Sequence, residues 1–245
     1  MQPAFSDPAR AIAPGGVLRA AINLGNPILA HRDAASGGPA GVSADLAMEL
    51  GRELGLAVEL VPFGRAAESV AAVRADQADI GFFAVDPARS AGLRFTAPYV
   101  LIEGSYLVPG RSVIQDNAQV DQQDNRVAVG QGSAYDLFLS RELRAARIER
   151  LAGAPEVLGA LLAGQADVAA GIRQVLAAWA ARDASLRLLP GRFMVIEQAM
   201  GLPSGRGDLA AQTLAAFVER MKSGGVVAAA LARHRVEGAT VAPPG

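Results

Sequence analysis

The feature that most constrains the fold is a long extended apolar run, Phe95–Val108 (FTAPYVLIEGSYLV). Strands in globular proteins usually have about five or six residues, so this run is too long for one ordinary core strand. It suits a strand that crosses from one lobe to another. A second run, Phe193–Leu202, is long enough to cross back. The chain is therefore predicted to form two lobes joined by a hinge of two crossing strands.

Strand and helix patterns alternate on both sides of the first run. Before it, apolar segments of strand length are separated by segments in which leucine or valine recurs at helical spacing. This β-α-β-α-β order with short links predicts a parallel sheet with helices on its faces. A similar order follows the run, so the expected fold class is α/β in both lobes. The expected strands are Val17–Leu24, Ala57–Phe63, Ile80–Val85, Arg126–Gly130, Arg147–Leu151 and Asp167–Ile172, and the main helices are Ser43–Leu54, Ala66–Ala75, Ala134–Leu143, Pro155–Leu162, Gln174–Arg182 and Asp208–Ser223.

The lobe boundaries follow from these segments. Residues 17–102 together with 196–236 are expected to form the first lobe, and residues 103–195 the second. Residues 1–16 are expected to be a flexible leader and residues 237–245 a frayed tail. Ligands of such sheets lie beyond the carboxyl ends of the strands, so the ligand cleft is expected between the lobes.

The composition excludes several kinds of site. The 245 residues include no cysteine, which excludes disulfides, thiolate catalysis and cysteine metal ligands. The two histidines, His31 and His234, stand far apart in the sequence, so neither a histidine metal site nor a Ser-His-Asp triad is expected. A formal net charge of −1 provides no strong field for nucleic acid or an anionic membrane. We therefore assign no catalytic residue, no metal and no cofactor, and expect no nucleic-acid partner.

One arginine follows a buried strand at a position that favours anions. Asp86-Pro87 ends the strand, since proline cannot continue a ladder and aspartate is a good N-cap. Arg89 then falls in the first helical turn, where a planar guanidinium can bind a carboxylate through two hydrogen bonds. The alternative is a solvated surface arginine. Phe82 and Phe83 alternate on the strand, so one is expected in the core and the other toward the cleft.

Five stretches, in order, carry a family resemblance. The chain resembles the bacterial family 3 solute-binding proteins, which are amino-acid-binding components of ABC transporters with the type II periplasmic-binding-protein fold. The resemblance covers nearly the whole chain from residue 16 to residue 236. The stretches are Val17–Pro27 (VLRAAINLGNP), Gly41–Leu54 (GVSADLAMELGREL), Ala78–Tyr99 (ADIGFFAVDPARSAGLRFTAPY), Val127–Ser133 (VAVGQGS) and Leu214–Val236.

The resemblance implies a set of ligand contacts. Arg89 would bind a ligand α-carboxylate, and Ser133, at a helix start in the second lobe, would bind the same group when the lobes close. For Ser133 the alternative is a plain helix cap. The wall of the first lobe would be lined by Asn23, Asn26 and the Phe82–Ala84 backbone.

The chain departs from the family pattern at two places. Ala84 lacks the hydroxyl that members often place before the arginine. Arg173 stands near the position where members that bind amino acids place an aspartate for the ligand ammonium. A second arginine would favour a diacid, unless Arg173 pairs with Asp167 or with the opposing lobe. Glu103 on one crossing segment, or Glu197 on the other, could replace the missing acid.

The resemblance implies a solute-binding protein that captures an amino acid or a related organic acid for ABC-transporter uptake or sensing. Its partners would be a small carboxylate-bearing ligand and an ABC permease, and the chain would be a monomer. The family implies a periplasmic location, although residues 1–16 do not resemble a signal peptide, which leaves a cytoplasmic regulatory protein open. The alternative from another class is a cyclohexadienyl (prephenate or arogenate) dehydratase-like enzyme, with Glu103 or Glu197 as its general acid.

Overall fold

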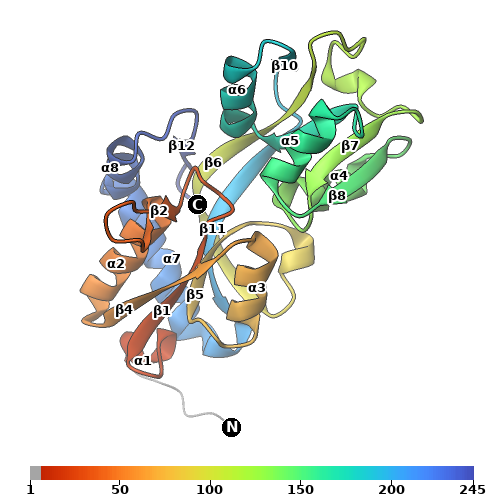
Figure 1. Cartoon of the computed structure of the whole chain (residues 1–245). Helices are drawn as coiled ribbons and strands as arrows, with labels where there is room; N and C mark the ends of the chain where they lie inside the picture. The colour runs from red at the N-terminus through yellow and green to blue at the C-terminus, as the bar shows by residue number, and fades with distance from the viewer. Residues whose placement is uncertain (1–6) are drawn as a thin grey trace. The chain divides into compact units, whose positions relative to one another are not determined.

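The computed structural model describes residues 7–245 and divides the chain into two compact units. Unit 1 comprises Met1–Leu101 and Glu197–Gly245, and unit 2 comprises Ile102–Ile196. Two long strands, β6 (Leu93–Pro109) and β11 (Met194–Pro203), carry the chain from one unit to the other and back. Both units combine strands with helices, which confirms the predicted α/β class (Figure 1).

Unit 1 contains a sheet in which β1 (Val17–Asn23) lies between β4 (Ala57–Phe63) and β5 (Ile80–Ala84), with both neighbours parallel to it (Figure 1). β11 pairs with β5 in the antiparallel direction and brings Gln198 opposite Ala84. The parallel arrangement places the carboxyl ends of β1, β4 and β5 at one edge of the sheet. The predicted ligand residues of unit 1 lie in the last residues of β1 and β5 or shortly after these strands, at that edge.

Helix α2 of unit 1 begins and ends where the backbone requires glycine. α2 (Val42–Leu54) has Gly41 as its N-cap, with a φ of 116°, and a Cβ there would lie 2.6 Å from the carbonyl oxygen of Leu29. Ser43, the first residue of the expected helix, lies inside the first turn and is buried. The helix ends at Leu54, as predicted, and its C-cap Gly55 has the left-handed conformation. The other elements of unit 1 are α3 (Ala66–Arg74), η1 (Pro87–Arg89), η3 (Ser204–Arg206), α7 (Gly207–Ser223), α8 (Val226–Arg233), and the short strands β2 (His31–Arg32), β3 (Pro39–Ala40) and β12 (Thr240–Val241).

Both ends of the described chain are packed, which corrects the expected leader and tail. α1 (Pro8–Ile12) begins after the N-cap Asp7, packs against α7 and buries Ile12 completely. At the other end, β12 pairs with β6, and Lys222 Nζ donates to the carbonyl oxygen of Pro243 at 2.8 Å. The predictions failed because burial of a short segment depends on partners that are distant in sequence. Residues 1–6 of the expected leader lie outside the described residues.

Unit 2 repeats the parallel arrangement on a smaller scale. β7 (Arg126–Gly130) lies between β8 (Arg147–Leu151) and β9 (Val168–Ile172), and β6 runs antiparallel to β9. Alternate residues of β7 face opposite sides, so Val127 joins one apolar cluster and Ala128 the other. The remaining elements are α4 (Ala134–Glu142), α5 (Ala154–Leu162), α6 (Arg173–Arg182), η2 (Asn117–Gln119) and β10 (Leu186–Leu188). Within residues 7–245, no helix is both long and apolar enough to span a bilayer.

Candidate functional site

The turn after β5 has the predicted structure. Asp86 is the N-cap of η1, and its Oδ1 accepts a hydrogen bond of 2.8 Å from the backbone N–H of Ala88. Pro87 occupies the first position of η1, where no backbone donor is needed. Arg74 of α3 donates to the carbonyl oxygens of Ala88 at 3.1 Å and Arg89 at 2.9 Å. Hydrogen bonds to the Asp86 carboxylate and from the Arg74 guanidinium therefore hold the backbone around Arg89 in place.

Arg89 is buried rather than solvated. Only 4% of the residue is exposed, and its Nη1 donates to the carbonyl oxygen of Ala84 at 3.1 Å. Burial lowers the pKa of the Arg89 guanidinium to about 10, with the charge of Asp86 acting in the opposite direction and that of Arg74 in the same direction as burial. A lowered pKa means that the folded protein disfavours the charged form of this base. A bound anion would favour the charged form and so offset the cost of burying it.

The loop after β1 carries Asn23 and Asn26. Asn23 Oδ1 accepts a hydrogen bond of 3.0 Å from the N–H of Gly25, so this side chain holds the turn. Asn26 is 9% exposed, and its Oδ1 has no hydrogen-bond partner among the residues described. Its backbone oxygen accepts from Leu29 and Ala30. Asn23 therefore has a structural function in the turn, whereas the side-chain acceptor of Asn26 is not used by the protein.

Neither phenylalanine of β5 is exposed. Phe82 packs edge-on against Tyr99 with ring centroids 6.1 Å apart, and Phe83 packs against Phe95 at 6.2 Å within the apolar cluster under α3. The two residues are 4% and 2% exposed. They pack in different surroundings, as their alternation predicts, but both rings belong to the interior of unit 1. Ala84 is also buried, and its contribution to the site is its carbonyl oxygen on Arg89.

Ser133 caps α4 in unit 2. Its Oγ accepts a hydrogen bond of 3.1 Å from the N–H of Asp136. The Asp136 carboxylate in turn accepts from the N–H of Gly132 at 2.8 Å and from Arg150 Nε at 2.9 Å. The turn at the carboxyl end of β7 is therefore held by a buried carboxylate, and Ser133 has the capping function that was its alternative reading.

Glu103 and Arg173, both predicted site residues, lie together in unit 2. Arg173 Nε is 3.7 Å from Glu103 Oε2, and Arg173 Nη1 donates to Ser105 Oγ at 3.4 Å and to the carbonyl oxygen of Gly191 at 2.5 Å. Arg192, which sequence analysis missed, donates through Nη1 to Glu103 Oε1 at 2.7 Å. The only signal for it is the Gly191-Arg192 turn just before the second crossing strand.

Asp167 does not pair with Arg173, which corrects one alternative reading. It binds Arg126 instead, through the backbone N–H and the guanidinium. Arg173 follows the carboxyl end of β9, whereas Asp167 precedes its amino end. The two side chains therefore belong to opposite edges of the unit 2 sheet.

Unit 2 also contains a groove that none of the predicted residues lines. Its volume is about 910 Å³, and it is bounded by Asn125 before β7, Asp167 before β9 and the end of α5. It therefore lies at the amino edge of the sheet. Val113 and Leu162, which are 87% and 53% exposed, line it.

The two histidines meet in unit 1 despite their separation in sequence. The rings of His31 and His234 pack edge-on with centroids 5.7 Å apart, and His234 Nε2 is 2.9 Å from Asp45 Oδ2. Arg233 also donates to that oxygen. In the part of the chain that the structure describes, no group of three or more histidine, cysteine or acidic side chains is arranged to hold a metal ion.

Comparisons with known proteins identify one protein family, and they find many solved structures with a fold similar to that of this chain. The family model described as bacterial extracellular solute-binding proteins, family 3, matches residues 18–234. A comparison with curated protein sequences found no match.

Three solved structures illustrate the similarity of fold. The solute receptor for L-cysteine of Neisseria gonorrhoeae is 24% identical, with a TM-score of 0.79 and 94% of each chain covered. An amino acid ABC transporter substrate-binding protein of Streptococcus pneumoniae bound to L-arginine is 20% identical, with a TM-score of 0.76, covering 94% of this chain and 98% of the other. The ancestral amino-acid-binding protein AncCDT-1, a precursor of cyclohexadienyl dehydratase, is 22% identical, with a TM-score of 0.74, covering 92% of this chain and 98% of the other. These matches confirm the type II periplasmic-binding-protein fold.

Proposed function

Because the chain belongs to the bacterial extracellular solute-binding proteins of family 3, we propose that it captures a small carboxylate-bearing solute, an amino acid or a related organic acid, for ABC-transporter uptake or for sensing. The observation that carries this proposal is the burial of Arg89 at the carboxyl edge of the unit 1 sheet. Its partners would be the solute and an ABC permease, and it would work as a monomer in the periplasm.

Arg89 is suited to bind the carboxylate because its position is rigid and its charge is poorly solvated. A guanidinium can donate two parallel hydrogen bonds to a carboxylate, and such charge-assisted pairs are about twice as strong as neutral ones. Burial lowers the pKa of Arg89, and a negative charge nearby acts in the opposite direction, as that of Asp86 does. Binding of an anion at this side chain therefore recovers free energy that folding has cost.

Residues of unit 2 would contact the same ligand. The backbone N–H groups at the start of α4 lie where the helix dipole favours an anion, and Ser133 stands at that start. Ser133 Oγ accepts from the N–H of Asp136 and its side chain also hydrogen-bonds that of Tyr135, so a ligand contact of this hydroxyl would replace the one to Tyr135. The wall of unit 1 would contact the ligand through the backbone that Asn23, Phe82 and Ala84 hold in place. Asn26 would contact it through its side-chain oxygen, which has no partner among the residues described.

A binding protein is favoured over the dehydratase-like enzyme. Elimination would need a general acid, and Glu103 was one candidate. Both oxygens of Glu103 face guanidinium groups, which leaves neither placed to deliver a proton to a substrate. The other candidate, Glu197, is exposed, and its backbone oxygen accepts from the N–H of Val85. Neither residue has the surroundings of a catalytic acid.

A thermal-shift screen tests the proposal. The full chain is screened against amino acids and mono- and dicarboxylates, with Arg89→Met as the test variant and Arg52→Gln, whose side chain is 70% exposed, as the matched control. A specific ligand at a hundred times its Kd stabilises the protein by about 2.7 kcal/mol. We expect this shift in the wild type and in the control but not in Arg89→Met. A ligand whose shift survives Arg89→Met would contradict the assignment, and turnover of prephenate or arogenate would favour the enzyme.

A further inference from the structure

The groove at the amino edge of the unit 2 sheet, which we call the unit 2 groove, is lined by none of the residues assigned to the solute. All of its lining residues fall between residues 109 and 186, so the unit 2 groove lies within one compact unit. Its volume of about 910 Å³ is that of sites for drug-sized molecules and exceeds what one amino acid needs. The unit 2 groove therefore has the size of a binding site of its own.

The two most exposed large apolar side chains of the described chain border this groove. Val113 is 87% exposed and Leu162 is 53% exposed, and both line it. Single exposed apolar side chains are normal on a protein surface, whereas two that border one hollow form a patch. A ligand with an apolar body would remove that patch from water. The remaining large apolar residues of the lining are buried, and they are Ile114, Leu161 and Leu186.

Two free charges of opposite sign line the same groove. Arg111 and Asp124 are both exposed, and within residues 7–245 neither side chain makes a hydrogen bond or an ion pair. The third charged residue of the lining, Asp167, already binds Arg126. Arg126 also donates to the carbonyl oxygen of Gly164 at the end of α5, so that helix end has its cation too. One cation and one anion are left, and a ligand that carries both charges complements them.

We propose that the unit 2 groove is a second binding site, which takes a short peptide of apolar residues with free ends. The apolar side chains of the peptide cover Val113 and Leu162, its carboxylate pairs with Arg111, and its ammonium group pairs with Asp124. A single amino acid fits less well, because both of its charges are attached to one carbon atom whereas Arg111 and Asp124 are too far apart to pair with each other. The site does not depend on the carboxylate contact proposed for Arg89 of unit 1.

Four tripeptides test the proposal by calorimetry on the full chain. Leu-Ala-Leu with free ends is compared with Ser-Ala-Ser, with its own N-acetylated form and with its own C-amidated form. We expect saturable binding of Leu-Ala-Leu and no measurable binding of Ser-Ala-Ser. Each capped form should bind about fivefold more weakly, which is the upper end for the loss of one exposed ion pair. Equal binding of the leucine and serine peptides, or of the free and capped forms, would overturn the proposal.

Variants locate the peptide on the unit 2 groove. Arg111→Gln should remove the effect of amidation, and Asp124→Asn the effect of acetylation. Ala184→Trp, at an exposed lining residue, should fill the groove and abolish binding. Leu162→Ser should weaken binding about tenfold and gives the same test if Ala184→Trp does not fold. Arg147→Gln, whose side chain is 71% exposed outside the groove, is the control. Unchanged binding in folded Ala184→Trp or in Leu162→Ser would overturn the proposal.

Failure of this inference can be told apart from failure of the proposed function. Arg89→Met should bind Leu-Ala-Leu as the wild type does, and loss of that binding would assign the peptide to the solute site and overturn the inference alone. Longer peptides that contain the same three residues and bind more than about tenfold tighter would assign the groove to a segment of a partner protein and overturn the short-peptide ligand. A negative screen of amino acids and carboxylates contradicts only the proposed function.

Discussion

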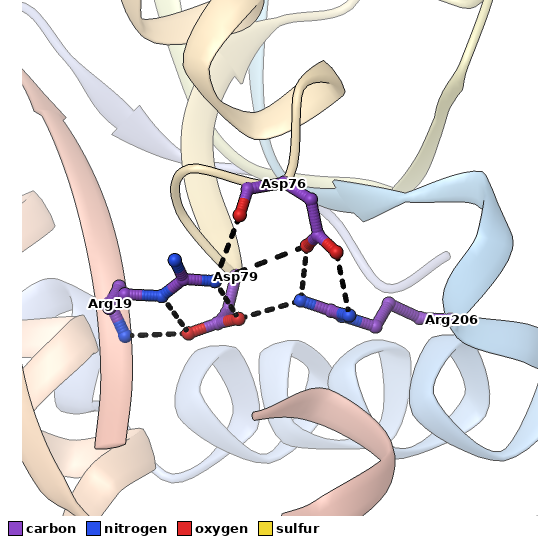
Figure 2. A network of polar contacts seen from close by, with 4 residues as sticks. All are labelled: Arg19, Asp76, Asp79 and Arg206. Atoms are coloured by element: carbon purple, nitrogen blue, oxygen red, sulfur yellow. Dashed lines mark hydrogen bonds and ion pairs between the residues drawn. The ribbon is translucent and has the colours of Figure 1, made fainter. Parts of the chain in front are cut away.

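Arg19 binds the buried carboxylate of Asp79 with its backbone and its side chain at once. Its backbone N–H donates to Asp79 Oδ2 at 2.9 Å, its Nε to the same oxygen at 3.1 Å, and its Nη2 to Oδ1 at 2.9 Å (Figure 2). Arg206 donates to Oδ1 from the other side at 2.7 Å. The pair fixes the start of β1 to the start of β5, which sets the register of the two strands that carry the unit 1 site.

Unit 2 contains the same pairing between Arg126 and Asp167. The backbone N–H and Nε of Arg126 donate to Asp167 Oδ2 at 2.9 Å each, and its Nη2 to Oδ1 at 3.0 Å. In both units the arginine also donates to a carbonyl oxygen in the preceding turn, that of Asp76 at 3.0 Å or Gly164 at 2.8 Å. Both turn residues have a positive φ, 59° and 68°. The matching sequences, ADQADI and AGQADV, indicate a repeated element.

The difference in burial between the two aspartates predicts a difference in stability. The Asp79 side chain is 1% exposed and has two arginine partners, whereas that of Asp167 is 35% exposed and has one. Asp79→Asn should lower the free energy of unfolding by about 3–5 kcal/mol, because it removes the buried carboxylate that Arg19 and Arg206 share and leaves them only the exposed carboxylate of Asp76. Asp167→Asn should lower it by about 1 kcal/mol. Urea denaturation measures both, with Asp208→Asn, 80% exposed, as the control. Equal losses would contradict this ranking.

Asp167 should also contribute to the pH dependence of stability. The hydrogen bond from Arg126 holds the pKa of Asp167 below its usual range, against the opposing effect of burial. A carboxyl whose pKa is lower in the folded state stabilises the protein above the unfolded pKa, near 3.9, and loses this contribution as pH falls through the folded pKa. Urea midpoints should therefore fall less between pH 5 and about pH 3 in Asp167→Asn than in the wild type. If the urea midpoints of the two proteins fell by the same amount over this pH range, the Arg126–Asp167 pair would have no such effect.

Local sequence patterns were sufficient for most of the fold. The predicted strands Ala57–Phe63 and Arg147–Leu151 match β4 and β8 residue for residue. The turn after β5 was also predictable, since Asp86 and Pro87 determine it through their own backbone preferences. In each case the determining residues lie within the segment itself. A short stretch of sequence therefore contains the information that is needed to predict each of these elements.

The remaining features depend on contacts between distant residues. Arg192 joins Glu103 across 89 positions, and Arg206 joins Asp79 across 127. No local pattern indicates such pairs, and the packing of Ile12 in α1 was missed for the same reason. Sequence analysis placed Arg89 near its turn but did not predict its burial, because burial follows from how α3 and β5 pack around it.

Lys222 should hold the C-terminal segment in place. It is the only lysine of the chain, its side chain is 4% exposed, and its Nζ donates to the carbonyl oxygens of Pro98 at 3.2 Å and Pro243 at 2.8 Å. Lys222→Met would leave both acceptors without a donor and should cost about 2 kcal/mol. Hydrogen exchange should then accelerate at the Ala242 N–H, which donates to Tyr99. Arg220→Gln, on the exposed side of the same helix, is the control. Unchanged exchange at Ala242 would mean that β12 alone holds the segment.

Arg89 should be a residue that the protein needs for binding and not for stability. Burial lowers the pKa of its guanidinium to about 10, so the charged form at neutral pH opposes folding. Arg89→Met keeps the length and apolar contacts of the side chain and removes the buried charge. We expect the ligand-free variant to lose no more than about 1 kcal/mol of unfolding free energy, since relief of the buried charge offsets the lost donor to the Ala84 carbonyl oxygen, while it no longer binds a carboxylate ligand. Calorimetric unfolding without ligand measures this. A loss of about 3–5 kcal/mol, the usual result of breaking a structural buried ion pair, would instead assign Arg89 to the architecture of unit 1.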